Sequence, residues 1–249
     1  MIYAPSPSTF TIDGGTHVNF APPYQALHHV ILPVIRRFGV VASCACPTVS
    51  LYRSGTPPPL RGRLHLSVTP SAALIPLHLL ELGTIISVHC WCVSDNACSA
   101  AAAAAAAACA AAAGAAFAEA VVSSEVTVSQ SAPGVALRSL SACLGLVAVS
   151  STGCILGADR MLLDMLPNGG EGGPRVTDGL KLAQAIVVEV CSAARVGACI
   201  DHQTCDQLPL FMSLATGPSR VRVQPLSEHT RSACFVASQF TGATFDVEV

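Results

Sequence analysis

Charged and aromatic residues are both scarce in this 249-residue sequence, at 11% and 5% of the chain. With a net charge of −2 there is no overall positive field, so any contact with nucleic acid would have to come from a local site. The first ten residues have neither the basic nor the apolar region of a secretory signal, and the 12 cysteines include no C-x-x-C pair. These absences argue against a secreted protein that is held together by disulfides.

The cysteines admit two interpretations. The favoured one is that they are reduced and mostly buried in an intracellular protein. The alternative is a zinc site in which His28, His29 or His202 would join cysteine ligands, although the sequence lacks the usual ligand spacing.

An alanine tract interrupts the middle of the chain. Residues 100–113 are all alanine except Cys109, and Glu119 is the only charged residue between Ser99 and Val122. Alanine contributes little transfer energy to membrane insertion, so a membrane-spanning segment is the less favoured alternative. The tract is predicted to be a low-complexity expansion of helical structure, either inserted in a loop or extending a helix.

The first third of the chain alternates between helical and strand patterns. After Pro22-Pro23, apolar residues recur at helical spacing as far as Phe38, with a kink expected at Pro33 and a helix end at Gly39. One strand is predicted to begin at residue 40. Another is predicted over 63–68, where Leu64, Leu66 and Val68 share a face. Residues 55–62 have the composition of a loop.

The second half continues this alternation. A buried strand is predicted over 144–149, a helix capped by Thr177 follows, and another helix runs over about 201–215. The apolar face of the Thr177 helix is predicted to contain Leu180, Ala183, Val187, Val190 and Ala194. Strands are predicted at 220–223 and 244–249, on either side of a last helix that begins near Ser227. The fold class is therefore α/β or α+β with layered sheets.

Three separated blocks carry a resemblance to a known family. They read GGTHV, APP, LP and RRFGV within residues 14–40, STGC at 151–154, and DQL, FM, LATG, SR and HT within residues 206–230. Their order and spacing are similar to those of the RNA 3′-terminal phosphate cyclase family, and the resemblance covers most of residues 11–83 and 142–249. The family's N-terminal third, with its GGGQ-x-LR motif, has no counterpart here, so a truncated member is expected. In the family, one loop has a lysine followed by glycines. The corresponding residues here, 57–62, have the sequence PPPLRG.

The resemblance implies an architecture as well as an activity. Family members have repeated units of two helices over a four-stranded sheet, together with a smaller inserted α/β domain. By that analogy residues 1–83 and 200–249 form the large domain. Residues 84–199 form the inserted domain, which contains the alanine tract at about 99–116.

His229 is the candidate nucleophile. The resemblance implies that it becomes covalently linked to AMP. Because Ser227 is a credible N-cap, His229 is expected in the first helical turn, where the positive end of the helix favours a neutral ring with a free lone pair. The same end of the helix can stabilise charge on the attacked phosphate. The alternative is an ordinary solvent-facing histidine beside a helix cap.

The resemblance implies further binding residues near ATP and RNA. The expected ATP-binding residues are Gln203, Thr204, Cys205, Asp206 and Gln207. Asp206 could hold a neighbouring donor or a metal-bound water, and Gln207 could read the nucleotide through its amide. The candidates for RNA phosphate contacts are Arg36, Arg37, Arg220 and Arg222. Gly14 and Gly15 are expected to serve backbone geometry at a tight turn or a close approach.

The implied reaction converts an RNA 3′-phosphate to a 2′,3′-cyclic phosphate. It uses ATP together with Mg²⁺ or another divalent cation, and it acts on RNA 3′-phosphate ends. No metal ligands from the protein are expected, and neither are a membrane or an obligate protein partner. The expected location is the nucleus, with the cytoplasm second. One alternative is a non-catalytic relative that acts in ribosome assembly, although such relatives lack the histidine and the DQL block. The other alternative is an inactive fragment.

Overall fold

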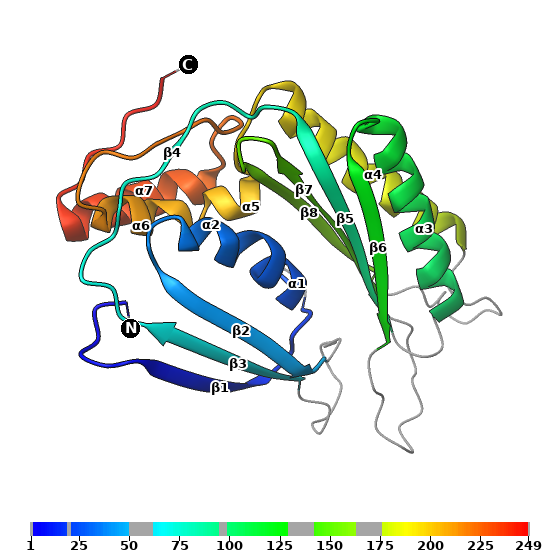
Figure 1. Ribbon diagram of the computed structural model, residues 1–249, viewed down its shortest axis with the longest axis horizontal. Coiled ribbons are helices and arrows are strands. Elements are labelled where there is room, and N and C mark those ends of the chain that lie inside the picture. The colour runs from blue at the N-terminus through cyan, green and yellow to red at the C-terminus, as the bar shows by residue number, and fades with distance from the viewer. Residues whose placement is uncertain are drawn as a thin grey trace.

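The computed structural model describes residues 2–18, 21–49, 62–94, 99–128, 142–162 and 176–248. Helices and strands alternate along these residues and pack in layers, which confirms the predicted α/β class (Figure 1). The predicted loop at 55–62 lies, apart from Gly62, outside the described residues.

The first layer is a three-stranded antiparallel sheet of order β1-β3-β2. It consists of β1 (Ser8–Gly14), β3 (Gly62–Thr69) and β2 (Val41–Thr48). The two strands predicted near 40 and 63–68 are therefore confirmed. The register of β2 shifts between Ala45 and Thr48, around Pro47, which has no N–H to donate to a neighbouring strand.

A continuous helical segment covers this sheet. It consists of α1 (Tyr24–Ala26), a π-helical turn η1 (Leu27–Ile31) and α2 (Leu32–Arg36), as the apolar spacing predicted. The wide turn directly precedes Pro33, whose ring would clash with the carbonyl of residue 29 in a regular α-helix. Gly39 ends the segment with a φ of +83°, a conformation that glycine adopts without strain.

The second layer is a four-stranded sheet of order β6-β5-β7-β8. Its strands are β5 (Ile85–Ser94), β6 (Val121–Val128), β7 (Ala142–Ser150) and β8 (Ile155–Leu162). β5 and β6 are parallel, whereas the other pairs are antiparallel. β7 is buried along almost its whole length, as its apolar run predicted.

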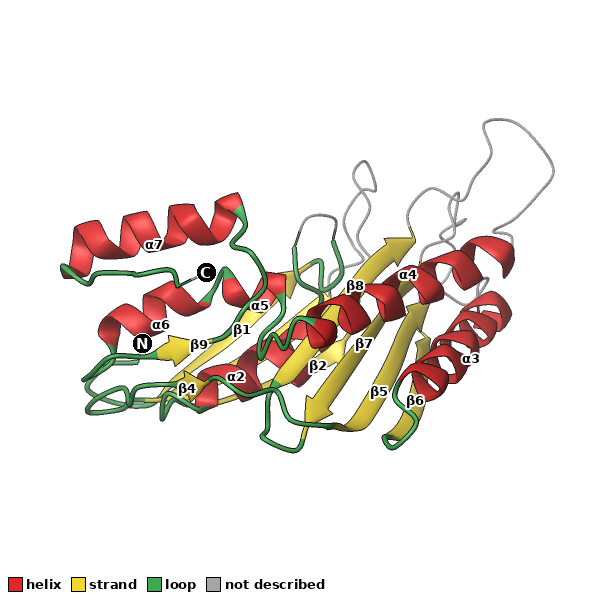
Figure 2. Ribbon diagram, turned by 90° about the horizontal axis from the view of Figure 1, so that it is seen from above, coloured by secondary structure: helices red, strands yellow, loops and turns green. Residues whose placement is uncertain are grey.

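Two long helices, α3 (Ser99–Ala116) and α4 (Val176–Arg195), cover one face of this sheet (Figure 2). The segment α1–η1 lies on the other face, where Gly157 of β8 contacts Val30. α3 is formed by the alanine tract and connects the parallel strands β5 and β6, a connection for which a crossover helix is usual. The predicted helix is thus confirmed, but it belongs to the packed core. Among the described residues no helix has the length and apolarity to span a membrane.

The buried face of α4 differs in part from the prediction. Ala183, Val187 and Val190 are buried as expected, whereas Leu180 is 42% exposed. Ile186 is fully buried, so the packed face is rotated relative to the predicted one. The helix starts at Val176, which puts the backbone of Thr177 inside it.

The C-terminal region contains three further helices and a short strand, β9 (Arg220–Val221), which pairs in parallel with β4 (His78–Leu79) from the first half of the chain. The helices are α5 (His202–Cys205), α6 (Leu208–Leu214) and α7 (Glu228–Thr241). The predicted single helix over 201–215 is wrong because Pro209 lacks the N–H that would continue it from α5. The strand predicted at 244–249 is also wrong for the described residues 244–248, which form no strand.

The predicted domain boundaries stay predictions. The four-stranded sheet and its two covering helices use residues 85–195, close to the predicted insert of 84–199. Ile200, at the second boundary, bridges Ile155 on one side and Val223 on the other.

Candidate active site at the start of the last helix

His229 lies in the first turn of α7, as predicted. Ser227 is the N-cap, with extended backbone angles of φ −68° and ψ 162°, and its hydroxyl accepts a hydrogen bond of 2.9 Å from the N–H of Thr230. The side chain of His229 is exposed, so its ring is accessible to a ligand. An N-terminal helix turn with an exposed histidine can receive a phosphate group at its free backbone N–H groups.

Asp206 connects the DQL block to this helix start. Its Oδ1 accepts a hydrogen bond of 2.7 Å from the hydroxyl of Ser227 and a second, short one from the hydroxyl of Thr230. Thr230 is buried, whereas Asp206 is half-buried. Hydrogen bonds to a carboxylate are stronger than those between neutral groups, so Asp206 fixes the backbone turn that carries His229.

The other predicted ATP-binding residues lie in different surroundings. Thr204 and Cys205 are buried in α5, and burial raises the pKa of the Cys205 thiol to about 11. Gln203 is half-buried, and Gln207 is exposed in the turn between α5 and α6, with no cap bond from its side chain. Of these five residues, Asp206 accepts hydrogen bonds from both hydroxyl groups at the helix start of His229, and the Cys205 thiol also interacts with Thr230 there.

Two carboxyl groups that were not predicted lie close to this region, the buried Asp201 and the half-buried Asp159. Asp201 caps α5, accepting bonds from the N–H and the hydroxyl of Thr204 at 2.9 and 3.0 Å and from the N–H of Gly157 at 3.1 Å. Burial raises the pKa of Asp201, although these hydrogen bonds oppose the shift.

Burial is also the main reason why the pKa of Asp159 is raised to about 6. Both carboxyl groups line a small pocket between η1, β8 and α5, together with Val30, Trp91 and Gln203. The position of Asp201 directly before a helical pattern is an N-cap signal, but no sequence signal marks Asp159.

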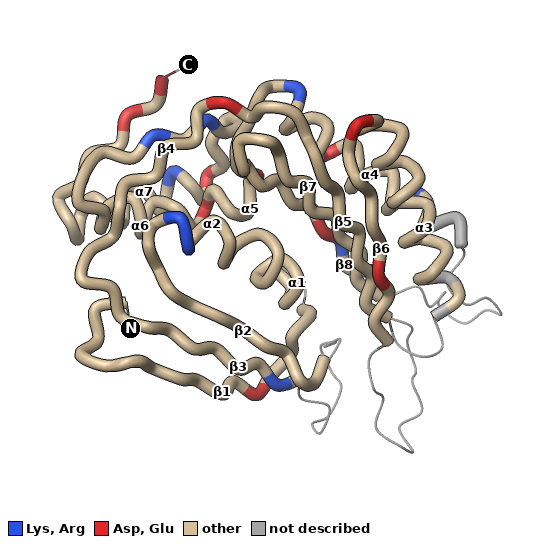
Figure 3. Tube along the Cα trace, viewed as in Figure 1, with Lys and Arg blue, Asp and Glu red and all other residues tan. Residues whose placement is uncertain are grey.

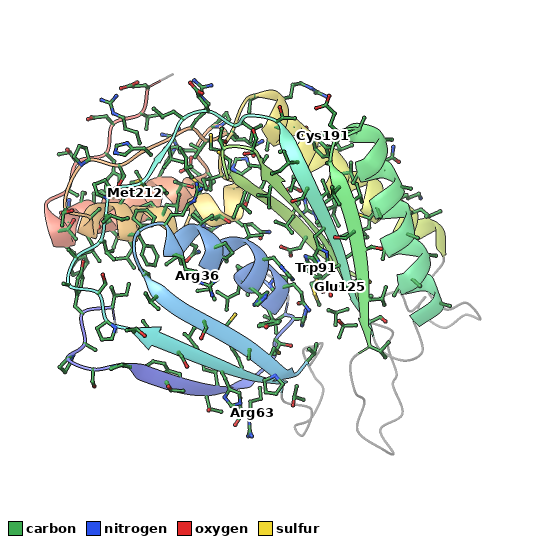
Figure 4. The ribbon with its side chains drawn as sticks, viewed as in Figure 1. Arg36, Arg63, Trp91, Glu125, Cys191 and Met212 are labelled. Atoms are coloured by element: carbon green, nitrogen blue, oxygen red, sulfur yellow. The ribbon has the colours of Figure 1, made fainter. Side chains whose placement is uncertain are left out.

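The predicted arginines form two separate groups. Arg36 is exposed, and its Nε donates a bond of 2.8 Å to the carbonyl of Ala42 (Figure 4). The guanidinium of Arg37 packs against Gly153, where a Cβ would clash with it. Arg220 and Arg222 are both exposed, at and just beyond β9. In the part of the chain that the structure describes, charged residues of both signs are scattered along the trace and form no single-sign stripe (Figure 3).

Neither Gly14 nor Gly15 is in a left-handed conformation, and the close approach in this region is at Gly62, which was not predicted. Gly14 ends β1 and pairs with Gly62 at the start of β3. A Cβ on Gly62 would lie 2.5 Å from Cγ2 of Thr16 and 2.9 Å from the carbonyl oxygen of Thr48, so the missing side chain matters most at Gly62. A Cβ on Gly14 would meet open space.

These features define a layered α/β protein with an accessible histidine on a capped helix start that a carboxylate holds in place. The sequence model of the family "RNA 3′-terminal phosphate cyclase" matches residues 1–247, and the chain belongs to this family.

The chain is similar to the RNA 3′-terminal phosphate cyclase of Drosophila melanogaster, with 28% identity over 99% of this chain and 63% of the relative. The cyclase of Pyrobaculum aerophilum is 26% identical over 98% of this chain and 64% of its own length. Over a shorter stretch, the cyclase of Ectopseudomonas mendocina is 40% identical across 35% of this chain and 24% of the relative. The chain thus spans just under two thirds of the first two of these relatives.

Proposed function

We propose that the chain takes part in ATP-dependent conversion of an RNA 3′-phosphate to a 2′,3′-cyclic phosphate, with His229 as the nucleophile. The observation that carries the proposal is the accessible ring of His229 on a helix start that Asp206 fixes through Ser227 and Thr230. Membership of the cyclase family supports the reaction class. Because the chain spans about 63% of a full-length relative, the activity is a proposal for this chain.

The proposed reaction has three balanced steps. A ring nitrogen of His229 attacks the α-phosphorus of ATP, a P–N bond forms, and the bond to pyrophosphate breaks. An oxygen of the RNA 3′-phosphate then attacks the same phosphorus and displaces the histidine. Finally the neighbouring 2′-hydroxyl attacks the 3′-phosphorus, closing the ring and releasing AMP. Each step depends on orientation and a good leaving group, which a fixed helix start can provide.

We propose that magnesium enters bound to ATP rather than held by a protein cage. Mg²⁺ prefers oxygen ligands and is commonly bound through one or two carboxylates and substrate phosphates. The carboxylate at the helix start, Asp206, already uses Oδ1 for two hydroxyl donors. Asp206 is therefore better suited to positioning the helix start than to holding a metal ion.

The proposed partner is the 3′-phosphate end of an RNA chain. Arg220 and Arg222 are the better candidates for phosphate contacts, since both are exposed. Arg36 already donates to a backbone carbonyl, and Arg37 packs against Gly153, so both have structural partners.

We further propose the nucleus as the place of action, which imaging of the tagged chain would test.

Incubation with ATP labelled at the α-phosphate tests the central claim. The chain should acquire label that is lost in acid and kept in base, as expected for a P–N bond. His229→Ala should abolish the label, whereas His78→Ala, which removes another exposed histidine, should keep it. Absence of label on the unaltered chain, or label that survives His229→Ala, contradicts the proposal and favours a non-catalytic binding role.

A further inference from the structure

Three potential metal ligands from separate elements meet on the side of the four-stranded sheet that faces η1. They are His29 on η1, His89 on β5 and Glu125 on β6, and their ligand atoms all lie within 4.8 Å of one another. Glu125 and its neighbour Trp91 appear in Figure 4 between α1 and β6. None of the three residues belongs to the proposed cyclase site.

The strand register explains why His89 and Glu125 are close. In the parallel pair β5–β6, His89 is opposite Ser123, and Trp91 is opposite Glu125. Alternate residues of a strand share a face, so positions 89 and 91 lie on the same face as 123 and 125. The π-helical turn carries His29 over that face, where its ring centroid is 5.1 Å from that of His89.

The hydrogen bonding of His89 prepares one nitrogen for a ligand. Its Nδ1 is 2.9 Å from the hydroxyl of Ser123, which orients the ring. Its Nε2 is buried, has no hydrogen-bond partner among the described residues, and lies 3.5 Å from Oε1 of Glu125. Metal-bound histidines usually have such an outer bond on the second nitrogen.

The distances suit a small divalent ion. Two ligands that are each 2.0–2.1 Å from a tetrahedral zinc ion are separated by about 3.4 Å. The 3.5 Å between Nε2 of His89 and Oε1 of Glu125 agrees with that separation. The three ligand atoms all lie within 4.8 Å of one another, so ion binding would shorten the longest of these separations.

An unpaired polar atom lies among the three side chains. Nε2 of His89 is buried and has no hydrogen-bond partner among the described residues, and such an unsatisfied nitrogen is costly in a folded protein. A metal ion bound by the three side chains would satisfy it.

We propose that His29, His89 and Glu125 form a binding site for a divalent transition-metal ion, with zinc first, whose fourth position is open to water. Two histidines and one glutamate are a known zinc ligand set, and imidazole ligands discriminate against magnesium. Glu125 is half exposed, which provides a path of entry. A bound ion would join η1 to the edge of the β5–β6 pair, so it would hold the helical layer against the sheet.

Two cysteines near the proposed site provide a competing possibility. Sγ of Cys44 lies 3.6 Å from Nδ1 of His28, the residue next to His29, and Cys46 is two residues further along β2. Burial raises the pKa of both thiols, which makes them poorer ligands at neutral pH. A metal held by thiolates would be spectroscopically distinct from one held by His29, His89 and Glu125.

Titration of the chelator-stripped 249-residue chain with Co²⁺ tests the site. We expect one Co²⁺ per chain, with visible bands of four-coordinate nitrogen and oxygen ligation and without a thiolate charge-transfer band. Zn²⁺ should displace it, and heat denaturation of the zinc-bound chain should occur at a higher temperature than that of the stripped chain.

Matched variants assign the ligands. His89→Ala and Glu125→Gln should each weaken Co²⁺ binding at least tenfold, and Ser123→Ala, which removes the orienting bond, by about tenfold. His65→Ala, on the other sheet, should leave binding unchanged, and circular dichroism should confirm that every variant is folded. No uptake by the stripped chain, a thiolate band that Cys44→Ser removes, or unchanged binding in His89→Ala would each overturn the proposal.

Discussion

The Oδ1 atom of Asp206 lies 2.7 Å from the hydroxyl of Ser227, the residue that caps the helix carrying His229. The same oxygen accepts a bond from Thr230, so one carboxylate holds the hydroxyl groups of both Ser227 and Thr230 at the helix start. The DQL block and the His-Thr pair are therefore one unit in space although 21 residues separate Asp206 from Ser227.

Asp206→Asn is expected to weaken this unit without changing its shape. The amide can still accept a hydrogen bond, but the loss of charge should lower the free energy of unfolding by about 1–2 kcal/mol. Labelling of His229 by ATP should slow because the helix start is less firmly held. Chemical denaturation and the labelling assay measure the two effects. Asp246→Asn, at an exposed position near the C-terminus, is the control and should change neither.

Arg220 and Arg222 are expected to contribute to the salt dependence of RNA binding. If each neutralises one phosphate of single-stranded RNA, replacement by glutamine should reduce the slope of log K against log salt by about 0.7. Arg63→Gln is the matched control, since Arg63 is exposed but paired with Asp13 at 2.7 Å. Equal slopes for Arg222→Gln and the unaltered chain would remove Arg222 from the interface.

His17 should make the fold sensitive to acid. It is fully buried between Thr16 and Gln25, and burial lowers its pKa from 6.5 to about 4. Between pH 6.5 and 4 the unfolded chain binds a proton at this site that the folded chain does not. The free energy of unfolding should therefore fall by about 3 kcal/mol as the pH drops through this range.

Comparison with His17→Gln isolates this effect, since glutamine does not titrate. The raised pKa of Asp159, about 6, acts in the opposite direction, because its folded form gains stability on protonation as the pH falls. Denaturation midpoints should be measured from pH 4 to 7. As the pH falls, stability should decrease less in His17→Gln and more steeply in Asp159→Asn than in the unaltered chain. Parallel curves for His17→Gln and the unaltered chain would contradict the assignment.

The sequence predicted features that depend on neighbours along the chain. The cap at Ser227, the end of the first helical segment at Gly39 and the buried strand near Leu144 all follow from local patterns. Contacts between distant residues were not predictable in this way. The bond from Ser227 to Asp206 depends on how the C-terminal helices pack, and the meeting of His29 with Glu125 depends on strand order and on the π-helical turn.

Gly145 is expected to be intolerant of a side chain for a reason invisible in the sequence. A Cβ there would clash with the indole of Trp91, its partner across β5 and β7. Gly145→Ala should therefore lower the free energy of unfolding by about 1–3 kcal/mol through overpacking. Gly114→Ala in α3 is the matched comparison, since its nearest neighbour would be 3.8 Å away and alanine favours helix by about 0.5–1 kcal/mol. Thermal denaturation should move in opposite directions for the two variants.

The alanine helix should respond to added volume according to which side of it is changed. One side of the helix is buried, at Ala102, Ala105, Ala106, Cys109 and Ala113. Ala103 and Ala107 on the other side are exposed, although the two sides have almost the same polarity. Small side chains let α3 lie close to both α4 and the sheet. Ala105→Leu should lower the free energy of unfolding by about 1–3 kcal/mol, whereas Ala107→Leu should stay within about 0.5 kcal/mol of the unaltered chain. Equal stability of the two variants would indicate that the tract is a dispensable expansion after all, and not the crossover helix that the parallel strands β5 and β6 require.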